Sequence, residues 1–172
     1  MKQEVLDCIK TRRSIRSFQE KQVPQDLLDA VLEAGTYAPS GMNQQPVVLV
    51  AVQDPKLIQQ IDRLNGEIMG REAPYYGAPT IILALADAER STCVEDGSCA
   101  LENMMLAAHA LGLGSCWIHR EKEMFASEQG KAWLKQWGLP ENLRGIGGLA
   151  LGYPKGEIPL AKPRRENRIL KL

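Results

Sequence analysis

The stretch from residue 38 to residue 52 reads Ala-Pro-Ser-Gly-Met-Asn-Gln-Gln-Pro-Val-Val-Leu-Val-Ala-Val. Its first nine residues are rich in Pro, Gly, Ser and Asn, which is typical of a loop. Its last six residues are continuously apolar, which is typical of a buried strand. The segment 24–36 just before it begins with Pro24 and repeats apolar residues at helical spacing from Leu27 onward. The stretch therefore predicts a helix, a loop and a buried strand in succession.

The rest of the chain alternates between helical and extended patterns. Helices are predicted over residues 2–11, 54–68, 98–111 and 121–137, and strands over residues 80–86, 112–118 and 147–151. A charged loop is expected to end at Gly97. No repeat, low-complexity run or linker divides the sequence, so we expect residues 1–172 to form a single domain. The tail from Tyr153 onward has no predicted element, and such a segment usually needs another surface to lie on.

Composition argues against several classes of function. The formal net charge is zero, whereas a nucleic-acid partner normally demands a basic surface. No apolar stretch approaches the roughly 20 residues of a membrane span, and the N-terminus lacks the apolar region of a secretory signal, so we expect a cytoplasmic protein. The four cysteines form no C-x-x-C pair and the chain has two histidines. We therefore expect no metal site.

The basic residues are distributed unevenly. Ten of the 21 lie in two short segments, residues 10–21 and 162–171, which hold one acidic residue each. Two distant basic clusters could converge on one small anion. They could equally be two solvated chain ends, and charge alone does not separate these interpretations.

Two patterns resemble functional motifs but fit a structural role better. Gly145-x-Gly147-x-x-Ala150 matches a dinucleotide fingerprint in spacing, but a strand and a turn follow it where the fingerprint requires a helix. Glu102 and His109 lie seven residues apart on one predicted helix. We interpret them as a buried polar stripe with satisfied hydrogen bonds, and not as an acid/base pair.

Five further motifs occur in a fixed order. Arg-Arg-Ser-Ile-Arg-Ser-Phe at 12–18 follows the first predicted helix, and the 38–46 loop precedes the first strand. A helix running into a glycine-rich turn and a strand lies between residues 97 and 118, and a G-x-x-x-G-Y-P ending and Lys-Pro-Arg follow at 148–154 and 162–164. Together these motifs resemble the FMN-binding nitroreductase family, and the resemblance covers nearly the whole chain.

The resemblance implies a fold and an assembly. The implied fold is α+β, with a central, mostly antiparallel sheet flanked by helices. The implied assembly is an intertwined homodimer in which the C-terminal tail wraps the partner subunit. The 38–46 loop would then reach the flavin of the other subunit, so each site would need both chains.

The resemblance also implies which residues bind FMN. The FMN phosphate carries about two negative charges, and basic side chains from both ends of the chain are suited to receive it. The end of the strand 112–118 would lie against the isoalloxazine ring, where a main-chain N–H can bond to N5. Asn65 is expected at the ring edge. The full set of expected cofactor-binding residues is Arg12, Arg13, Ser14, Arg16, Pro39, Ser40, Gly41, Asn43, Asn65, Trp117, Ile118, His119, Lys162 and Arg164.

The activity implied by the resemblance is hydride transfer from NADH or NADPH, through flavin N5, to a small acceptor such as a nitroaromatic or a quinone. No side chain is expected to act as a catalytic group. Val47 stands where family members often have Trp, and the chain lacks the extra helical segment that covers the substrate side of larger members. Three alternatives stay open: a non-catalytic flavin-binding protein, a flavin-modifying or dehalogenating enzyme of the same fold, and a helical interaction module.

Overall fold

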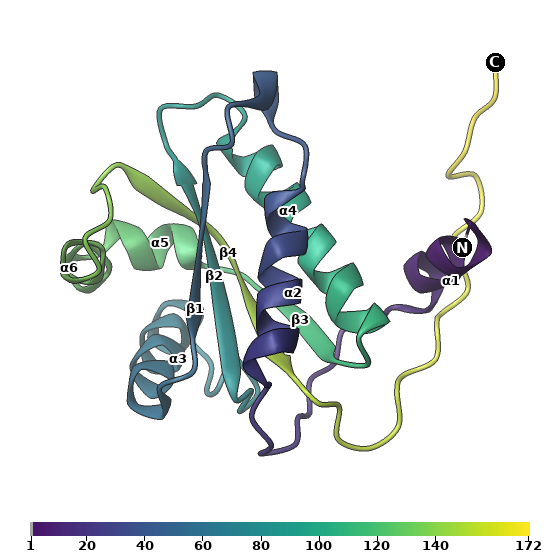
Figure 1. Cartoon of the computed structure of the whole chain (residues 1–172), viewed down its shortest axis with the longest axis horizontal. Helices are drawn as coiled ribbons and strands as arrows, with labels where there is room; N and C mark the ends of the chain where they lie inside the picture. Colours follow the sequence, from purple (N-terminus) through teal and green to yellow (C-terminus); the bar gives the residue numbers. More distant parts are fainter. Residues whose placement is uncertain (1) are drawn as a thin grey trace.

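A four-stranded sheet forms the centre of the molecule. The computed structural model describes residues 2–172. The strands pair in the order β1-β2-β4-β3, and every neighbouring pair is antiparallel. Helices lie on both sides of the sheet (Figure 1), so the expected α+β class is confirmed. The strands are β1 (Val47–Val52), β2 (Thr80–Asp87), β3 (Gly114–Ile118) and β4 (Leu143–Gly152).

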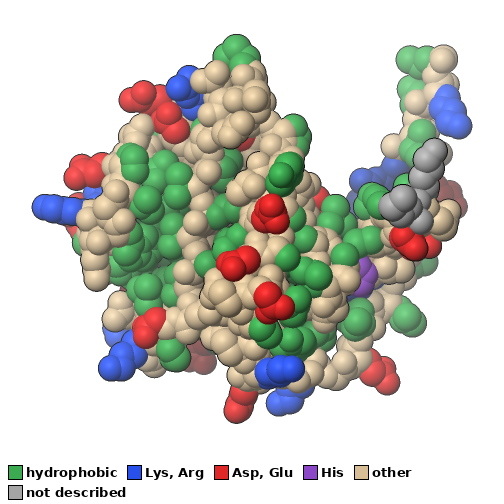
Figure 2. Space-filling view, viewed as in Figure 1, with side chains coloured by type: hydrophobic (Ala, Val, Ile, Leu, Met, Phe, Trp, Pro, Cys, Tyr) green, Lys and Arg blue, Asp and Glu red, His purple; other side chains and the backbone are tan. Residues whose placement is uncertain are grey.

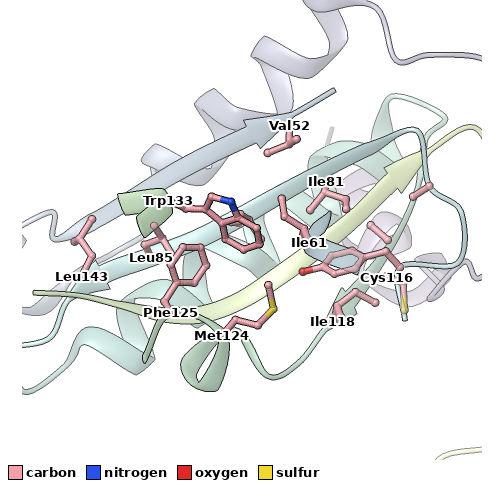
Figure 3. Packing of buried hydrophobic residues seen from close by; sticks show 14 of the residues in the cluster. Val52, Ile61, Ile81, Leu85, Cys116, Ile118, Met124, Phe125, Trp133 and Leu143 are labelled. Atoms are coloured by element: carbon pink, nitrogen blue, oxygen red, sulfur yellow. The ribbon is translucent and has the colours of Figure 1, made fainter. Parts of the chain in front are cut away.

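Each face of the sheet has its own helices and its own apolar core. On one face lie α2 (Gln25–Thr36) and α4 (Cys93–Ala110), and on the other lie α3 (Pro55–Met69), α5 (Glu121–Ala126) and α6 (Glu128–Gln136). In β2, Ile81 and Leu83 belong to the core beneath α3, α5 and α6, while Ile82 and Ala84 belong to the core beneath α2 and α4. Because both faces are covered, β2 reads as a continuous apolar run and not as an alternating one. Figure 3 shows side chains that α5 and α6 contribute to the core on their face of the sheet.

Two predicted helices have different bounds in the structure. Helix α4 begins at Cys93, so the prediction of a charged loop ending at Gly97 is wrong. The acidic Glu95 and Asp96 occupy its first turn, where negative charge suits the helix dipole. The helix predicted over residues 121–137 is two helices, since Ser127 adopts an extended conformation between them and caps α6 by accepting a hydrogen bond from the Gly130 N–H at 3.2 Å.

The glycine-rich segment near residue 147 is a strand, as predicted, but β4 begins at Leu143 and not at 147. A bulge leaves Ile146 unpaired, because Ala84 pairs with Gly147 and Leu85 with Gly145. A Cβ on Gly147 would lie 2.7 Å from Nε1 of Trp117. These glycines therefore allow close packing within the fold and form no dinucleotide loop.

The N-terminal segment and the beginning of the tail run side by side. Phe18 and Pro154 form an isolated antiparallel bridge, and the Lys155 N–H donates to the Ser17 carbonyl at 3.0 Å. After Gly156 the chain leaves the body of the protein (Figures 1 and 2), and every residue from 155 to 172 is exposed. No helix in the described part of the chain has the length and apolar character to cross a membrane.

Candidate functional site

The basic segment, residues 12–16, is fixed along the start of β3. It follows α1 (Lys2–Thr11), which lies beside α4 (Figure 1). Ser14 forms a parallel bridge with Ser115, and the Ile15 N–H donates to the Ser115 carbonyl at 2.9 Å. Ile15 is buried against Gly114, where a Cβ would lie 2.8 Å from its side chain. Because successive side chains of an extended segment point to opposite sides, this burial directs Ser14 and Arg16 the other way.

Two guanidinium nitrogens of the basic segment lack an acceptor. Arg12 Nη1 and Arg13 Nε are buried and have no hydrogen-bond partner among the residues that the structure describes. Arg13 bonds through its other nitrogens to the carbonyls of Arg12 and Lys10, the latter at 2.9 Å. Arg12 Nε lies 3.8 Å from Glu102, at the outer limit of an ion pair. An unpaired buried donor is costly, so this pattern is typical of a site whose acceptor comes from outside the chain.

The structure adds Arg71 to this region, which the sequence did not indicate. Arg71 and Arg16 both approach the ring of Tyr76, with Cζ 5.2 and 5.9 Å from its centroid. Burial raises the pKa of the Cys116 thiol, while Arg16, a hydrogen bond with Ser14, and Arg71 act in the opposite direction. Arg16 and Arg71 therefore both lie close enough to Cys116 on β3 to affect its thiol. Arg71 lies in a charged turn between α3 and β2, and such a turn is usually only a solvated surface.

The turn that ends β3 presents main chain at the surface. Trp117 is half-buried, Ile118 is 4% exposed, and His119 and the following Arg120 are exposed. Asn65 is fully buried beneath this turn, and its Nδ2 donates to the His119 carbonyl at 3.0 Å. Asn65 therefore lies directly beneath the main chain that is expected to face the flavin, and its side-chain amide bonds to that main chain.

The 38–46 loop lies at the N-terminal end of α4 and contains the short 3₁₀ helix η1 (Gly41–Asn43). The Gly41 N–H donates to Asp96 at 3.0 Å, and a Cβ on Gly41 would collide with Thr92, so the loop is held tightly against the helix. Met42 and Asn43 have φ values of 50° and 54°, which L-residues rarely adopt. The predicted Pro39, Ser40, Gly41 and Asn43 thus lie together on a constrained, partly exposed loop.

The remaining predicted residues, Lys162 and Arg164, lie on the exposed tail. Among the described residues, no hydrogen bond or ion pair is present that fixes either side chain in place.

The interpretation of Glu102 and His109 as a buried polar stripe is wrong. Both face the N-terminal part of the chain: Glu102 is exposed and approaches Arg12, and the His109 ring lies 2.9 Å from the Thr11 hydroxyl. Burial and the charges of Arg12 and Arg13 lower the pKa of His109. The two residues therefore border the basic segment and form no acid/base pair with each other.

The geometry defines the class as an α+β protein with an antiparallel sheet and a cluster of basic side chains at its β3 edge. The sequence profile of the nitroreductase family matches residues 9–74 and 69–153. The chain belongs to the nitroreductase family. A curated relative from Archaeoglobus fulgidus, assigned by inference as an NADH dehydrogenase/NAD(P)H nitroreductase, is 34% identical over 90% of this chain and 88% of its own.

Other relatives carry more specific names. An FMN reductase [NAD(P)H] of Bacillus subtilis is 28% identical over 94% of this chain and 70% of its own. The crystal structure of a nitroreductase with bound FMN from Bacteroides fragilis superposes with a TM-score of 0.91, at 34% identity and 98% coverage of both chains. An FMN-dependent nitroreductase from Clostridium difficile superposes with a TM-score of 0.88, at 27% identity and complete coverage of both.

Proposed function

We propose that this protein is an FMN-dependent oxidoreductase that passes electrons from NADH or NADPH to a small acceptor. The observation that carries the proposal is the pair of buried guanidinium nitrogens, Arg12 Nη1 and Arg13 Nε, that lack an acceptor. A phosphate would supply that acceptor, since arginines and a serine offer it several charge-assisted hydrogen bonds. The FMN bound in the B. fragilis relative supports the choice of ligand.

The proposed roles of the other site residues follow from their positions. Ser14 and Arg16 point away from buried Ile15 and would receive the phosphate with Arg12 and Arg13. The main chain from Trp117 to His119 would face the flavin ring. Asn65 would hold that main chain from below through its bond to the His119 carbonyl.

We further propose that the active protein is a homodimer. The 38–46 loop contacts α4 at Asp96, whereas the basic segment and the preceding Thr11 contact the same helix at Glu102 and His109, which are about 9 and 20 Å from Asp96 along the axis. A second copy of the chain would bring the loop of one subunit to the basic segment of the other. Each flavin would then lie between two chains.

The exposed apolar surface around α1 supports this assembly. Val5, Leu6 and Ile9 are 61%, 49% and 52% exposed, although they form the apolar face of the helix. Figure 2 shows apolar side chains at the surface around α1 and over α4, where Cys8, Leu106 and Ala107 line a groove of about 390 Å³. The partner's tail would cover this surface and carry its Lys162 and Arg164 to the phosphate.

The FMN, when bound, would supply the redox chemistry by accepting and returning a hydride at N5. The chain's own residues would bind the phosphate, orient the ring and exclude water, so no side chain is assigned as a proton donor or nucleophile. NAD(P)H and the acceptor would occupy the same open pocket in turn. Nitroaromatics and quinones are the proposed acceptors.

Spectroscopy and turnover test this function. The purified protein is expected to be yellow, to lose its flavin absorbance when NADH or NADPH is added anaerobically, and to oxidise NAD(P)H steadily when a quinone is present. A yellow protein that is never reduced would be a flavin-binding protein without this activity. A colourless protein that takes up no FMN would overturn the proposed function.

A further inference from the structure

A fully buried carboxyl group lies beneath the turn that ends β3. The side chain of Glu121 is 0% exposed, which is rare for a glutamate. Its Oε1 accepts hydrogen bonds from the Tyr75 hydroxyl at 2.5 Å and from Asn65 Nδ2 at 3.2 Å. Glu121, Tyr75 and Asn65, here called the Glu121 cluster, come from three separate segments of the chain.

Strand β4 is shaped around this cluster. A Cβ on Gly148 would lie 2.5 Å from Glu121 Oε1 and closer still to the Tyr75 hydroxyl. A Cβ on Gly145 would collide with the Glu121 main-chain carbonyl. The two glycines therefore provide the space that the buried acid and its turn occupy.

The cluster is connected directly to the exposed turn. Asn65 Nδ2, which donates to Glu121, also donates to the His119 carbonyl at 3.0 Å. The intervening Arg120 has a φ of 91°, a strained conformation that persists only where the surrounding structure holds it. One buried amide thus links the acid to the main chain that would face the flavin.

Burial favours the protonated form of Glu121, and one of its two carboxyl oxygens has no hydrogen-bond partner among the described residues. Burial raises the pKa of Glu121 from the usual 4.5 to about 7, against the opposing hydrogen bonds from Tyr75 and from the Gly148 main chain. Oε2 has no partner among the described residues, and leaving a charged oxygen unpaired in the interior costs more than leaving a neutral one unpaired. The charges around it are few: Glu123 lies on the same helix and adds repulsion, and Asp62 stands behind Tyr75, accepting from its N–H at 2.8 Å.

On the basis of the proposed function, we propose that Glu121 is a positioning residue for the turn that faces the flavin, and that its single proton sets the charge beneath that turn. When the proton is lost, a buried anion lies under the site and disfavours the negative charge that a flavin gains on reduction. When the proton is held, that penalty disappears. The reduction potential of bound FMN should therefore depend on the protonation state of Glu121.

The test compares the reduction potential of bound FMN in wild type, Glu121→Gln and Glu128→Gln between pH 5.5 and 8.5. Glu128→Gln is the matched control, because it removes a carboxylate that is 99% exposed on the neighbouring helix α6. At pH 8.5 and a fixed ambient potential, Glu121→Gln should raise the ratio of reduced to oxidised flavin about tenfold, which is about 30 mV for a two-electron couple. At pH 5.5 it should match wild type, and the control should match wild type throughout.

A second measurement tests the titration itself without turnover. The folded-state pKa is raised, so wild-type stability from this group is fully present below pH 4.5 and is lost as pH rises to about 7. The folding equilibrium constant of Glu121→Gln relative to wild type should thus increase on the order of a hundredfold between pH 4.5 and 8. If Glu121→Gln does not fold, Tyr75→Phe replaces it and should move the break in the potential–pH curve upward.

The outcomes separate the two proposals. A flavin-loaded protein whose potentials in wild type and Glu121→Gln run parallel at every pH overturns this inference alone. A protein that takes up no FMN overturns the proposed function and this inference with it.

Discussion

The basic segment and the Glu121 cluster are both buried and charged, but they are satisfied differently. In the basic segment, Arg12 Nη1 and Arg13 Nε have no acceptor among the described residues. In the Glu121 cluster, Tyr75 and Asn65 both donate to Glu121 Oε1 from within the chain, although Glu121 Oε2 and Asn65 Oδ1 also lack a partner among the described residues. A carboxyl group can take up a proton and stay buried without an outside partner, whereas a guanidinium stays charged and indicates an acceptor from outside. The two regions should therefore respond to mutation in opposite ways.

The largest effect is expected from Gly148→Ala. The added Cβ would overlap both Glu121 Oε1 and the Tyr75 hydroxyl, and strand β4 has β2 and β3 on either side and cannot move away. The free energy of unfolding should fall by about 3 kcal/mol or more, or the protein should fail to accumulate. Urea unfolding monitored by tryptophan fluorescence would measure the loss.

Gly138→Ala provides the control for this substitution. Gly138 has a φ of 68° but open space around it, so an alanine there costs strain of about 1 kcal/mol without a collision. Combining Gly148→Ala with Tyr75→Phe should recover part of the loss, since one colliding atom is removed. Equal losses for Gly148→Ala and Gly138→Ala would show that β4 is not shaped around the cluster.

The basic segment should respond through ligand affinity and not through stability. Arg12→Ala removes a buried nitrogen that has no partner in the chain, so the free energy of unfolding of flavin-free protein should change by less than about 1 kcal/mol. FMN binding should weaken by about 1.5–3 kcal/mol, which is roughly tenfold or more in the dissociation constant. Quenching of FMN fluorescence on titration with protein measures this constant.

Arg63→Ala is the matched control, because the Arg63 side chain is 81% exposed and, among the described residues, forms an ion pair with Glu67 alone, on the same helix α3. It should leave both FMN affinity and stability close to wild type. An Arg12→Ala variant that loses several kcal/mol of stability while it keeps its FMN would reverse the comparison, since the basic segment would then be structural.

The sequence predicted the elements whose signal is local. The prediction of β2 is confirmed, because burial on both faces produces a continuous apolar run. The loop before β1 is also confirmed, because turns favour proline and glycine. The start of α4 was missed, because its acidic first turn resembles a loop when the helix dipole is not considered. The break at Ser127 was missed for a similar reason, since a serine between two amphipathic stretches interrupts no hydrophobic period.

The functional residues likewise fall into a group with a local sequence signal and a group without one. The motifs at residues 12–18 and 38–46 were recognisable as continuous strings. The Glu121 cluster was not, because its members are far apart in the chain and Glu121 precedes Lys122 and Glu123, as the start of a solvated helix would. Glycines at 145 and 148 were the available signal, since glycine inside a strand often marks a close approach. Only the fold shows what approaches them.

The smallest effect, and the finest test of the comparison, is the change with pH in the stability that Tyr75→Phe loses. The substitution removes one donor from Glu121 without changing any charge, and the burial of Tyr75 with Glu121 beside it raises the tyrosine pKa, so the hydroxyl donates throughout the neutral range. A hydrogen bond to a carboxylate is worth about 1.5–3 kcal/mol and one to a neutral acid about 1 kcal/mol. The loss of unfolding free energy should therefore be larger at pH 8 than at pH 5. The exposed Tyr37→Phe should change stability by less than about 0.5 kcal/mol at either pH, and a Tyr75→Phe loss independent of pH would mean that Glu121 holds the same charge across this range.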